Sequence, residues 1–199
     1  MRAIFMVSAL IAVLAGGAAA QQKGAFTDGR DGKAYKTAKI GEQTWMTENL
    51  NYQTKTDSSW CYNNSADSCK KYGRLYGWNT AKTVCPSGWK LPDTADWDRL
   101  KTAAGGREIA GKKLKSKSGW KENGNGTDDY GFSALPGGHR YPDGGFYDAG
   151  SFGYWWTATE YDVRDAYLRY MNYDNDGVYE NYYYLNRSEG YSVRCVSEK

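Results

Sequence analysis

The chain has 199 residues, with 26 Lys and Arg against 23 Asp and Glu, and a formal charge of +3. Because charges of both signs are interspersed, the composition excludes the concentrated basic stripe that is typical of nucleic-acid-binding proteins. One short basic string, from Gly111 to Lys121, is expected to form a solvated face.

The first predicted element is a secretory signal peptide over residues 1–20. Arg2 precedes an apolar run from Ala3 to Leu14, and the small residues Ala18 to Ala20 suit cleavage before Gln21. The apolar run is shorter than the about 20 residues that a membrane span needs. We therefore expect residues 21–199 to form one domain with no membrane span after cleavage, which is secreted, displayed at the cell surface or kept in the periplasm.

Four cysteines in an exported chain predict two disulfides, and the sequence alone permits three pairings. We expect Cys61 to pair with Cys69, which closes the short polar loop CYNNSADSC. We expect Cys85 to pair with Cys195, which ties the middle of the chain to its last strand. A zinc site is disfavoured because the chain has no C-x-x-C pair and a single histidine, His139.

The N-terminal half contains turn dipeptides that flank short β-prone runs, which predicts a hairpin. Tyr35 and Ile40 lie in one arm, and Trp45 and Met46 in the other. A short helix is then expected to end near Cys85, because Pro86 cannot continue it.

The clearest helical pattern follows Asp93, which can cap a helix. Trp97, Leu100 and Ala104 recur at helical spacing, and the glycines after Ala104 end the helix. A further short helix is expected over REIAGKKLK.

From Gly119 onward, glycine-rich loops are followed by four strand-like runs, GYWWTAT, DAYLRYMNY, GVYENYYYL and YSVRCVS. In the last run, alternation places Cys195 on the buried side and Arg194 on the opposite side. The predicted fold class is therefore α+β, with two or three short helices packed on a twisted antiparallel sheet and a long loop region.

Six separated strings resemble the Fibrobacter succinogenes major paralogous domain, a family of exported bacterial proteins: IGEQTWMTENLNY, YGRLYGWNTA, CPSGWKLPDTADWDRL, DDYGFSALPGGHR, GYWWTATE and YSVRCV. Three of them are also similar to the C-type lectin-like fold and the formylglycine-generating enzyme domain. The resemblance implies a lectin-like fold with paired terminal strands, two helices and a long loop region, and it implies the Cys85–Cys195 bridge. The calcium-dependent sugar-binding triplets of lectins are absent, and only Cys195 lies in the C-terminal half, so neither related activity carries over.

The sequence offers three groups of candidate site residues. Trp155 and Trp156 are adjacent, so one is expected in the core, while the other is either open for stacking on a sugar ring or buried under the long loop. Nine tyrosines in the C-terminal hairpins predict either a binding surface or ordinary cross-strand pairing. The proposed ligand-binding residues are Trp155, Trp156, Glu160, Tyr173, Tyr179 and Tyr183.

Calcium is the one cofactor for which the sequence offers ligands, in the acidic strings TDDYG and DNDG. The candidate oxygen ligands are Asp128, Asp129, Asp174 and Asp176, although a hairpin turn and a hydrogen-bonded loop are the favoured interpretations. His139 has no nucleophile in a recognised setting, so we interpret it as structural.

These observations favour a non-enzymatic binding module that recognises carbohydrate, with plant cell-wall polysaccharide as one candidate ligand. The alternative is a structural or adhesive surface protein that binds a cell-surface protein, and an enzyme is the least favoured class. No nucleic-acid partner is expected.

Overall fold

The computed structural model describes residues 22–55, 58–181 and 186–198, which form a mixed α+β structure with several sheets. The predicted signal peptide and Tyr183 lie outside the described residues. Four α-helices are present among them: α1 (Ala66–Tyr72), α2 (Trp78–Val84), α3 (Thr94–Ala103) and α4 (Ala110–Leu114), with a 3₁₀ turn, η1 (Tyr62–Asn64). None of the helices in this part of the chain is long and apolar enough to cross a membrane.

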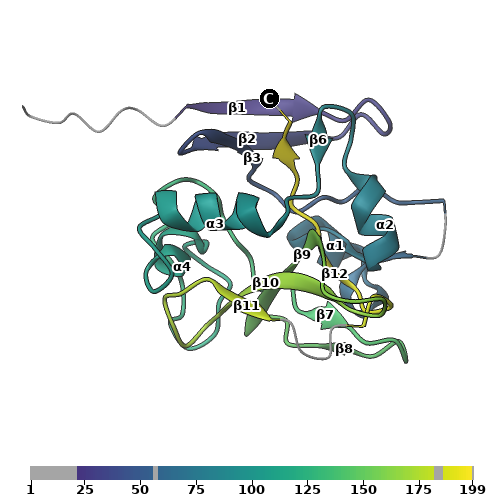
Figure 1. Ribbon diagram of the computed structural model, residues 1–199. Helices are drawn as coiled ribbons and strands as arrows, with labels where there is room; N and C mark the ends of the chain where they lie inside the picture. Colours follow the sequence, from purple (N-terminus) through teal and green to yellow (C-terminus); the bar gives the residue numbers. More distant parts are fainter. Residues whose placement is uncertain (1–21, 56–57, 182–185, 199) are drawn as a thin grey trace, which may run out of the picture.

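The first sheet has the strand order β1 (Lys23–Thr27), β2 (Ala34–Ile40), β3 (Gln43–Met46), β13 (Val196–Ser197) and β6 (Trp89–Lys90). The hairpin of β2 and β3 confirms the predicted arms, with Ala38 opposite Trp45. Figure 1 shows this sheet at the top, with the last segment of the chain rising from the lower sheet to join it.

The second sheet has the order β11 (Tyr179–Asn181), β10 (Ala166–Asn172), β9 (Phe152–Glu160), β12 (Tyr191–Ser192), β5 (Leu75–Tyr76) and β4 (Ser59–Trp60). All its pairs are antiparallel except that of β12 with β9. A separate two-stranded ribbon joins β7 (His139–Arg140) to β8 (Phe146–Tyr147). The predicted single antiparallel sheet is thus divided into three in the described residues.

α3 confirms the clearest helix prediction. Asp93 caps it through a capping box with Asp96, in which each side chain accepts a hydrogen bond from the backbone N–H of the other residue, at 2.7 and 3.1 Å. Trp97 and Leu100 are fully buried. Gly105 follows at a φ of 104°, a conformation that favours glycine and ends the helix.

Both predicted disulfides are present, Cys61–Cys69 and Cys85–Cys195. The segment between Cys61 and Cys69, expected to be a polar loop, instead contains η1 and the first half of α1. Cys195 is fully buried, as predicted.

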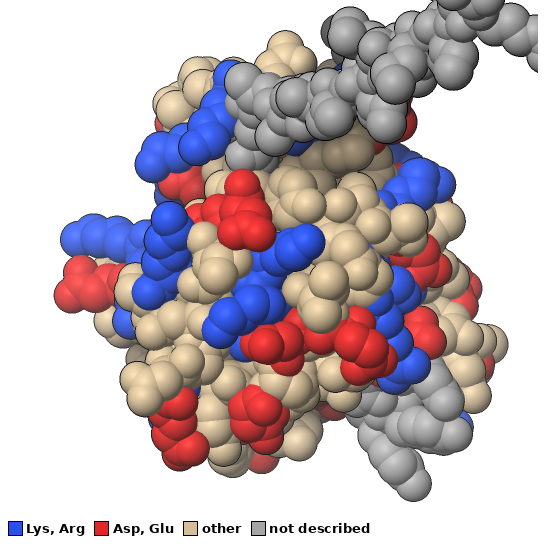
Figure 2. All heavy atoms as spheres, turned by 90° about the vertical axis from the view of Figure 1, so that its left-hand side faces the viewer, with Lys and Arg blue, Asp and Glu red and all other residues tan. Residues whose placement is uncertain are grey.

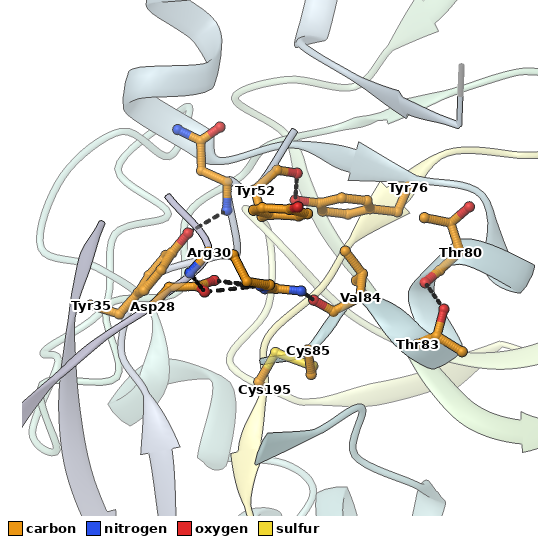
Figure 3. The surroundings of a disulfide bond; sticks show 11 residues. Asp28, Arg30, Tyr35, Tyr52, Tyr76, Thr80, Thr83, Val84, Cys85 and Cys195 are labelled. Atoms are coloured by element: carbon orange, nitrogen blue, oxygen red, sulfur yellow. Dashed lines mark hydrogen bonds and ion pairs between the residues drawn. A yellow bond between two sulfur atoms is a disulfide. The ribbon is translucent and has the colours of Figure 1, made fainter. Parts of the chain in front are cut away.

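Arg30, in the turn between β1 and β2, binds the C-terminal end of α2, which directly precedes Cys85 (Figure 3). Arg30 forms an ion pair with Asp28 at 2.6 Å and donates a hydrogen bond to the Val84 carbonyl at 2.8 Å. Its guanidinium carbon also lies 3.9 Å from the ring centroid of Tyr52. The hydrogen bond from Arg30 holds the pKa of Asp28 below its usual value, so this pair stays charged at neutral pH.

Two predictions about polar residues are wrong. The run YSVRCVS is not one strand, because β12 belongs to the second sheet and β13 to the first, and Arg194 between them is buried.

The basic string from Gly111 is not wholly solvated either. Lys115 is 1% exposed, and its Nζ donates to the carbonyls of Asn172 and Asn175 at 3.1 and 2.8 Å.

Charges of both signs are interspersed on the face of the molecule that carries α4 and the adjoining loops (Figure 2). This arrangement agrees with the composition, which shows only a small excess of basic residues.

Candidate functional site

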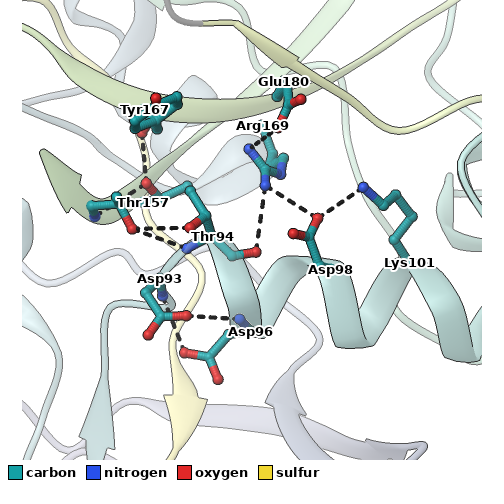
Figure 4. Close-up of polar contacts among 10 residues, drawn as sticks. Asp93, Thr94, Asp96, Asp98, Lys101, Thr157, Tyr167, Arg169 and Glu180 are labelled. Carbon is teal, nitrogen blue, oxygen red and sulfur yellow. Dashed lines mark hydrogen bonds and ion pairs between the residues drawn. The ribbon is translucent and has the colours of Figure 1, made fainter. Parts of the chain in front are cut away.

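An open hollow of about 410 Å³ lies where α3 begins to cross the strands β9, β10 and β11 (Figure 4). We call it the Arg169 hollow. Its lining residues are Thr94, Asp98, Thr159, Tyr161, Tyr167, Arg169 and Glu180.

Arg169 lies at the floor of the hollow, with a side chain that is only 2% exposed. Its Nη2 is 3.2 Å from Oδ1 of Asp98 and 3.4 Å from the carbonyl of Thr94, and its Nη1 is 3.2 Å from Oε2 of Glu180. The strand register sets part of this arrangement, because Arg169 is directly opposite Glu180 in the pairing of β10 with β11. One buried guanidinium therefore holds two carboxylates, each about half exposed (52% and 50%).

Asp98 is charged at neutral pH. Burial raises its pKa, but the hydrogen bond from Lys101 at 2.8 Å and the positive charge of Arg169 outweigh burial, so the pKa is below its usual value. An ionised carboxylate accepts hydrogen bonds and has no proton to give. The Asp98 side of the hollow can therefore hold ligand hydroxyl groups but is not set up as a general acid.

Tyr161 and Tyr167 form the aromatic wall of the hollow. Their rings pack edge to face, with centroids 5.4 Å apart, and Tyr161 is 46% exposed. An irregularity in the sheet places them there, because between two paired positions β9 has three residues and β10 has only Tyr167. An exposed tyrosine beside carboxylates gives the hollow an apolar face next to hydrogen-bond acceptors.

Two threonine hydroxyls complete the lining. Oγ1 of Thr159 accepts a hydrogen bond from the backbone N–H of Thr94 at 3.1 Å and lies 3.3 Å from Oγ1 of Thr94. The capping box of α3 positions Thr94, which is the first residue of the helix. The hollow thus combines a cation, two anions, hydroxyl groups and an aromatic ring.

Of the two alternatives for the tryptophan pair, the structure shows burial, because the side chains of Trp155 and Trp156 are both fully buried and neither offers a stacking face. They do face opposite sides of β9, as predicted, but each side is covered by a hydrophobic cluster. Trp155 packs with Trp97, and Trp156 packs with Tyr191. Their indole N–H groups donate to Asn49 and to the Tyr76 carbonyl at 2.9 and 2.7 Å.

The other predicted ligand-binding residues lie close to the hollow in sequence but do not line it. Glu160 is exposed and forms ion pairs with Lys82 and Arg187 at 3.8 and 3.3 Å. Tyr173 is half-buried against the hydrophobic cluster that contains Trp155, and Tyr179 packs beside Tyr170, with ring centroids 5.6 Å apart.

The four candidate calcium ligands are not brought together as a metal site. Among residues 22–55, 58–181 and 186–198, no group of three or more His, Cys, Asp or Glu side chains is placed to hold a metal ion. Asp128 accepts hydrogen bonds from the backbone N–H and the hydroxyl of Ser133, both at 2.7 Å. Asp176 lies 4.0 Å from the Nζ of Lys112, and Asp174 accepts a hydrogen bond from the side-chain amide of Asn175 at 3.4 Å. The backbone N–H of Asp129 donates to the carbonyl of Lys113 at 2.9 Å.

Sequence reasoning missed the centre of the hollow. Arg169 and Asp98 are ordinary polar positions in an alternating strand and on a helix, and no local pattern separates a buried arginine from an exposed one. The presence of Tyr161 and Tyr167 in the tyrosine-rich hairpins was the available signal, but it did not distinguish them from the other seven tyrosines.

His139 lies outside the hollow, 6% exposed, among tyrosine rings. Its ring centroid is 4.8 Å from that of Tyr141 and 5.6 Å from that of Tyr191. Burial lowers its pKa, against the opposing charge of Asp148, so the ring is neutral at pH 7. This placement agrees with the interpretation of His139 as a structural residue.

Glu189 gives a pH-dependent prediction for the same cluster. Burial raises its pKa above the ordinary 4.5, although Tyr191 donates a hydrogen bond to it. As pH rises above 4.5, the unfolded chain releases this proton before the folded chain does, so stability falls until the folded pKa is passed. We expect Glu189→Gln to remove this fall while it keeps an acceptor for Tyr191.

Urea unfolding of the wild type and of Glu189→Gln from pH 4.5 to 8 measures this effect. His139 has a lowered pKa and changes stability in the opposite direction, but it does so in both proteins, so their difference isolates Glu189. A difference in unfolding free energy that does not change with pH would contradict the prediction.

The sequence of residues 38–197 matches the model of a known protein family, the Fibrobacter succinogenes major domain. The chain belongs to this family. No curated protein matches it. No solved structure matches it either. The matched range begins inside β2 and ends in β13, so the Fibrobacter succinogenes major domain includes every residue of the Arg169 hollow and both disulfides.

Proposed function

We propose that this protein is an exported, non-enzymatic binding module that recognises carbohydrate through the Arg169 hollow. The observation that carries the proposal is the buried Arg169 held between two half-exposed carboxylates beside the exposed ring of Tyr161. Sugar hydroxyls donate well to charged acceptors, and the less polar face of a pyranose packs on an aromatic ring. Plant cell-wall polysaccharide is the ligand class that we favour.

A polymer suits the surroundings of the hollow better than a single sugar. A second open groove of about 420 Å³ shares Asp98 with the hollow and continues along α3 beside the turn between β2 and β3. Its lining residues are Ile40, Gly41, Glu42, Gln43, Asp98, Arg99, Thr102 and Ala103. Neighbouring sugar units of one chain could occupy the two depressions on either side of Asp98.

We also propose that the architecture is C-type lectin-like. Four features support this proposal: β13 pairs with β3 and β6, Cys85 is bridged to Cys195, the helices α2 and α3 both contact β9, and the segment 115–151 is rich in loops. The two disulfides suit an oxidising compartment outside the cytoplasm, which supports export.

The test is retention on insoluble cellulose and xylan, together with a glycan array. We expect the wild type to bind at least one glycan and Tyr161→Ala to bind it about tenfold more weakly, because the loss of one stacking ring and its buried area is worth about 1–2 kcal/mol. Tyr141→Ala is the matched control, since Tyr141 is 43% exposed but lies in the loop between β7 and β8, outside the hollow.

The possible outcomes separate the candidate functions. Failure of the wild type to bind any glycan would remove the carbohydrate proposal and favour the alternative of a surface protein that binds another protein. An equal loss in Tyr141→Ala and Tyr161→Ala would show that the ligand does not depend on the Arg169 hollow.

A further inference from the structure

A basic groove lies between β2, the segment that follows β3, the end of α1 and the loop around Ser133. It consists of two adjoining depressions of about 260 and 240 Å³ that share Lys36, Thr47 and Ser133. We call it the lysine groove. Its charged lining residues are Lys23, Lys33, Lys36, Glu48, Lys70, Lys71 and Asp128.

The charge in this groove is mainly positive. Five lysines line it, against the two carboxylates Glu48 and Asp128. Both carboxylates already accept local hydrogen bonds, Glu48 from the backbone N–H of Lys36 at 2.8 Å and Asp128 from Ser133. Of the five lysines, only Lys70 has a carboxylate partner within the described residues, the exposed Asp67.

A buried cation lies beneath the floor. Arg194 is 1% exposed, and its Nε and Nη2 donate to Oδ1 of Asn49 at 3.0 and 2.6 Å, while its Nη1 donates to the Phe132 carbonyl. It forms no ion pair in the described part of the chain. Burial lowers the pKa of Arg194 to about 9, so it remains charged at neutral pH.

The charge of Arg194 lies close to the groove, because both of its hydrogen-bond partners adjoin it. Asn49 lines the groove, and Phe132 directly precedes the lining residue Ser133. Charges in a poorly solvated interior are weakly screened, and positive walls concentrate the potential of a cleft. An anion in the lysine groove would thus be attracted both by the lysines at the rim and by Arg194 below.

We propose that the lysine groove binds a carboxylated glycan, a chain that contains uronic acid units. Lysines spaced along a groove match carboxylates repeated along a chain, while Thr47, Asn51 and Ser133 offer neutral hydrogen-bonding groups to sugar hydroxyls. The aromatic residues that line the groove are Tyr35, which is buried, and Tyr72, whose ring centroid lies 4.7 Å from the Nζ of Lys71. The groove therefore offers no row of open rings on which successive bases could stack, which disfavours single-stranded nucleic acid. The inference rests on the proposed carbohydrate function and adds a second, charge-selective site to it.

The test is affinity electrophoresis and calorimetry of the mature chain with polygalacturonate at low and moderate salt. We expect Lys36→Ala/Lys71→Ala to bind at least about tenfold more weakly, because hydrogen bonds between charged groups are stronger than those between neutral groups. The matched control is Lys117→Ala/Lys121→Ala, which removes two equally exposed lysines from outside the groove. The control should differ from the wild type by less than about twofold, since surface charges outside the groove are screened.

Fully methyl-esterified polygalacturonate, in which the charges are masked, should bind weakly. Three results would overturn the inference: no binding of polygalacturonate by the wild type, an equal loss in the control pair, or equally tight binding of polyphosphate and single-stranded DNA. Neutral cellulose and xylan report on the Arg169 hollow, whose two carboxylates repel a polyanion, and polygalacturonate reports on the lysine groove, so failure of either site is distinguishable from failure of the other.

Discussion

Replacement of Cys85 and Cys195 by alanine should lower the free energy of unfolding by about 4–5 kcal/mol, against about 2–3 kcal/mol for Cys61 and Cys69. The difference arises from loop length. The two bridges join residues 110 and 8 positions apart, and the longer link removes more freedom from the unfolded chain. Alanine is preferred to serine because Cys195 is fully buried, so a serine hydroxyl there would need a hydrogen-bond partner.

The Cys85–Cys195 bridge also joins the end of α2 to the segment between β12 and β13. Cys195 belongs to the hydrophobic cluster around Trp156, and the residue before Cys85 is held by Arg30 from the N-terminal turn. Loss of the Cys85–Cys195 bond should therefore loosen the contact between the last segment and α2, besides its effect on the unfolded chain.

Urea unfolding of the two double variants, followed by tryptophan fluorescence, measures this difference. The Cys61–Cys69 variant is the control, since it removes the same number of sulfur atoms. An equal or larger loss in the control would contradict the loop-length argument. A loss of several kcal/mol is a large part of the stability of a typical domain, so we expect the Cys85–Cys195 variant to be partly unfolded at 37 °C.

The second large effect is expected at Asn49. Its Oδ1 accepts hydrogen bonds from Nε1 of Trp155 at 2.9 Å and from two nitrogens of Arg194. Its Nδ2 donates to the Tyr72 carbonyl at 2.8 Å and to the Ser192 hydroxyl at 3.3 Å. One amide thus holds β9, α1 and the segment between β12 and β13 together.

Asn49→Ala should destabilise the protein by about 3–5 kcal/mol, because it leaves a buried guanidinium with one carbonyl as its remaining acceptor. Asn51→Ala is the matched control. The Asn51 side chain makes one hydrogen bond, to the Cys69 carbonyl at 2.9 Å, and contacts no buried charge, so we expect a loss of about 1 kcal/mol.

Thermal and urea unfolding of both variants test this difference. Similar losses in Asn49→Ala and Asn51→Ala would show that Arg194 finds other partners. Restoration of stability by Asn49→Ala/Arg194→Met would instead confirm that the cost comes from the uncompensated charge, because an apolar side chain can occupy such a site without a partner.

The local elements could be predicted from the sequence with fair success. Short-range rules predict the arms of the β2–β3 hairpin, the capped helix α3 and the Cys61–Cys69 pair, through turn residues, a capping aspartate and a short loop. The Cys85–Cys195 bridge joins residues 110 positions apart and was implied by the family resemblance. α1 was missed because its sequence, ADSCKKY, is polar and lies in a segment that resembles a loop.

Such short-range rules did not predict the residues of the Arg169 hollow. Alternation correctly placed Trp155 and Trp156 on opposite sides of a strand, but it carries no information about what covers each side. Both sides of β9 are covered by hydrophobic clusters, so neither indole is exposed. The tyrosines drew attention to the right hairpins, yet the hollow depends on Asp98 from α3, which the chain places beside Arg169 across a separation of 71 residues.

The sequence by itself determined the short-range features of this protein, because turn and cap patterns act over a few residues. It also determined the family, which is recognised from several separated strings of residues. Only the tertiary structure decided which polar groups are buried and which charges meet. Arg169, Arg194 and Lys115 occupy positions that periodicity assigns to solvent or leaves open, and each is buried because distant carbonyls, amides or carboxylates converge on it. The free energy of a buried charge depends on these long-range partners, which no local pattern contains.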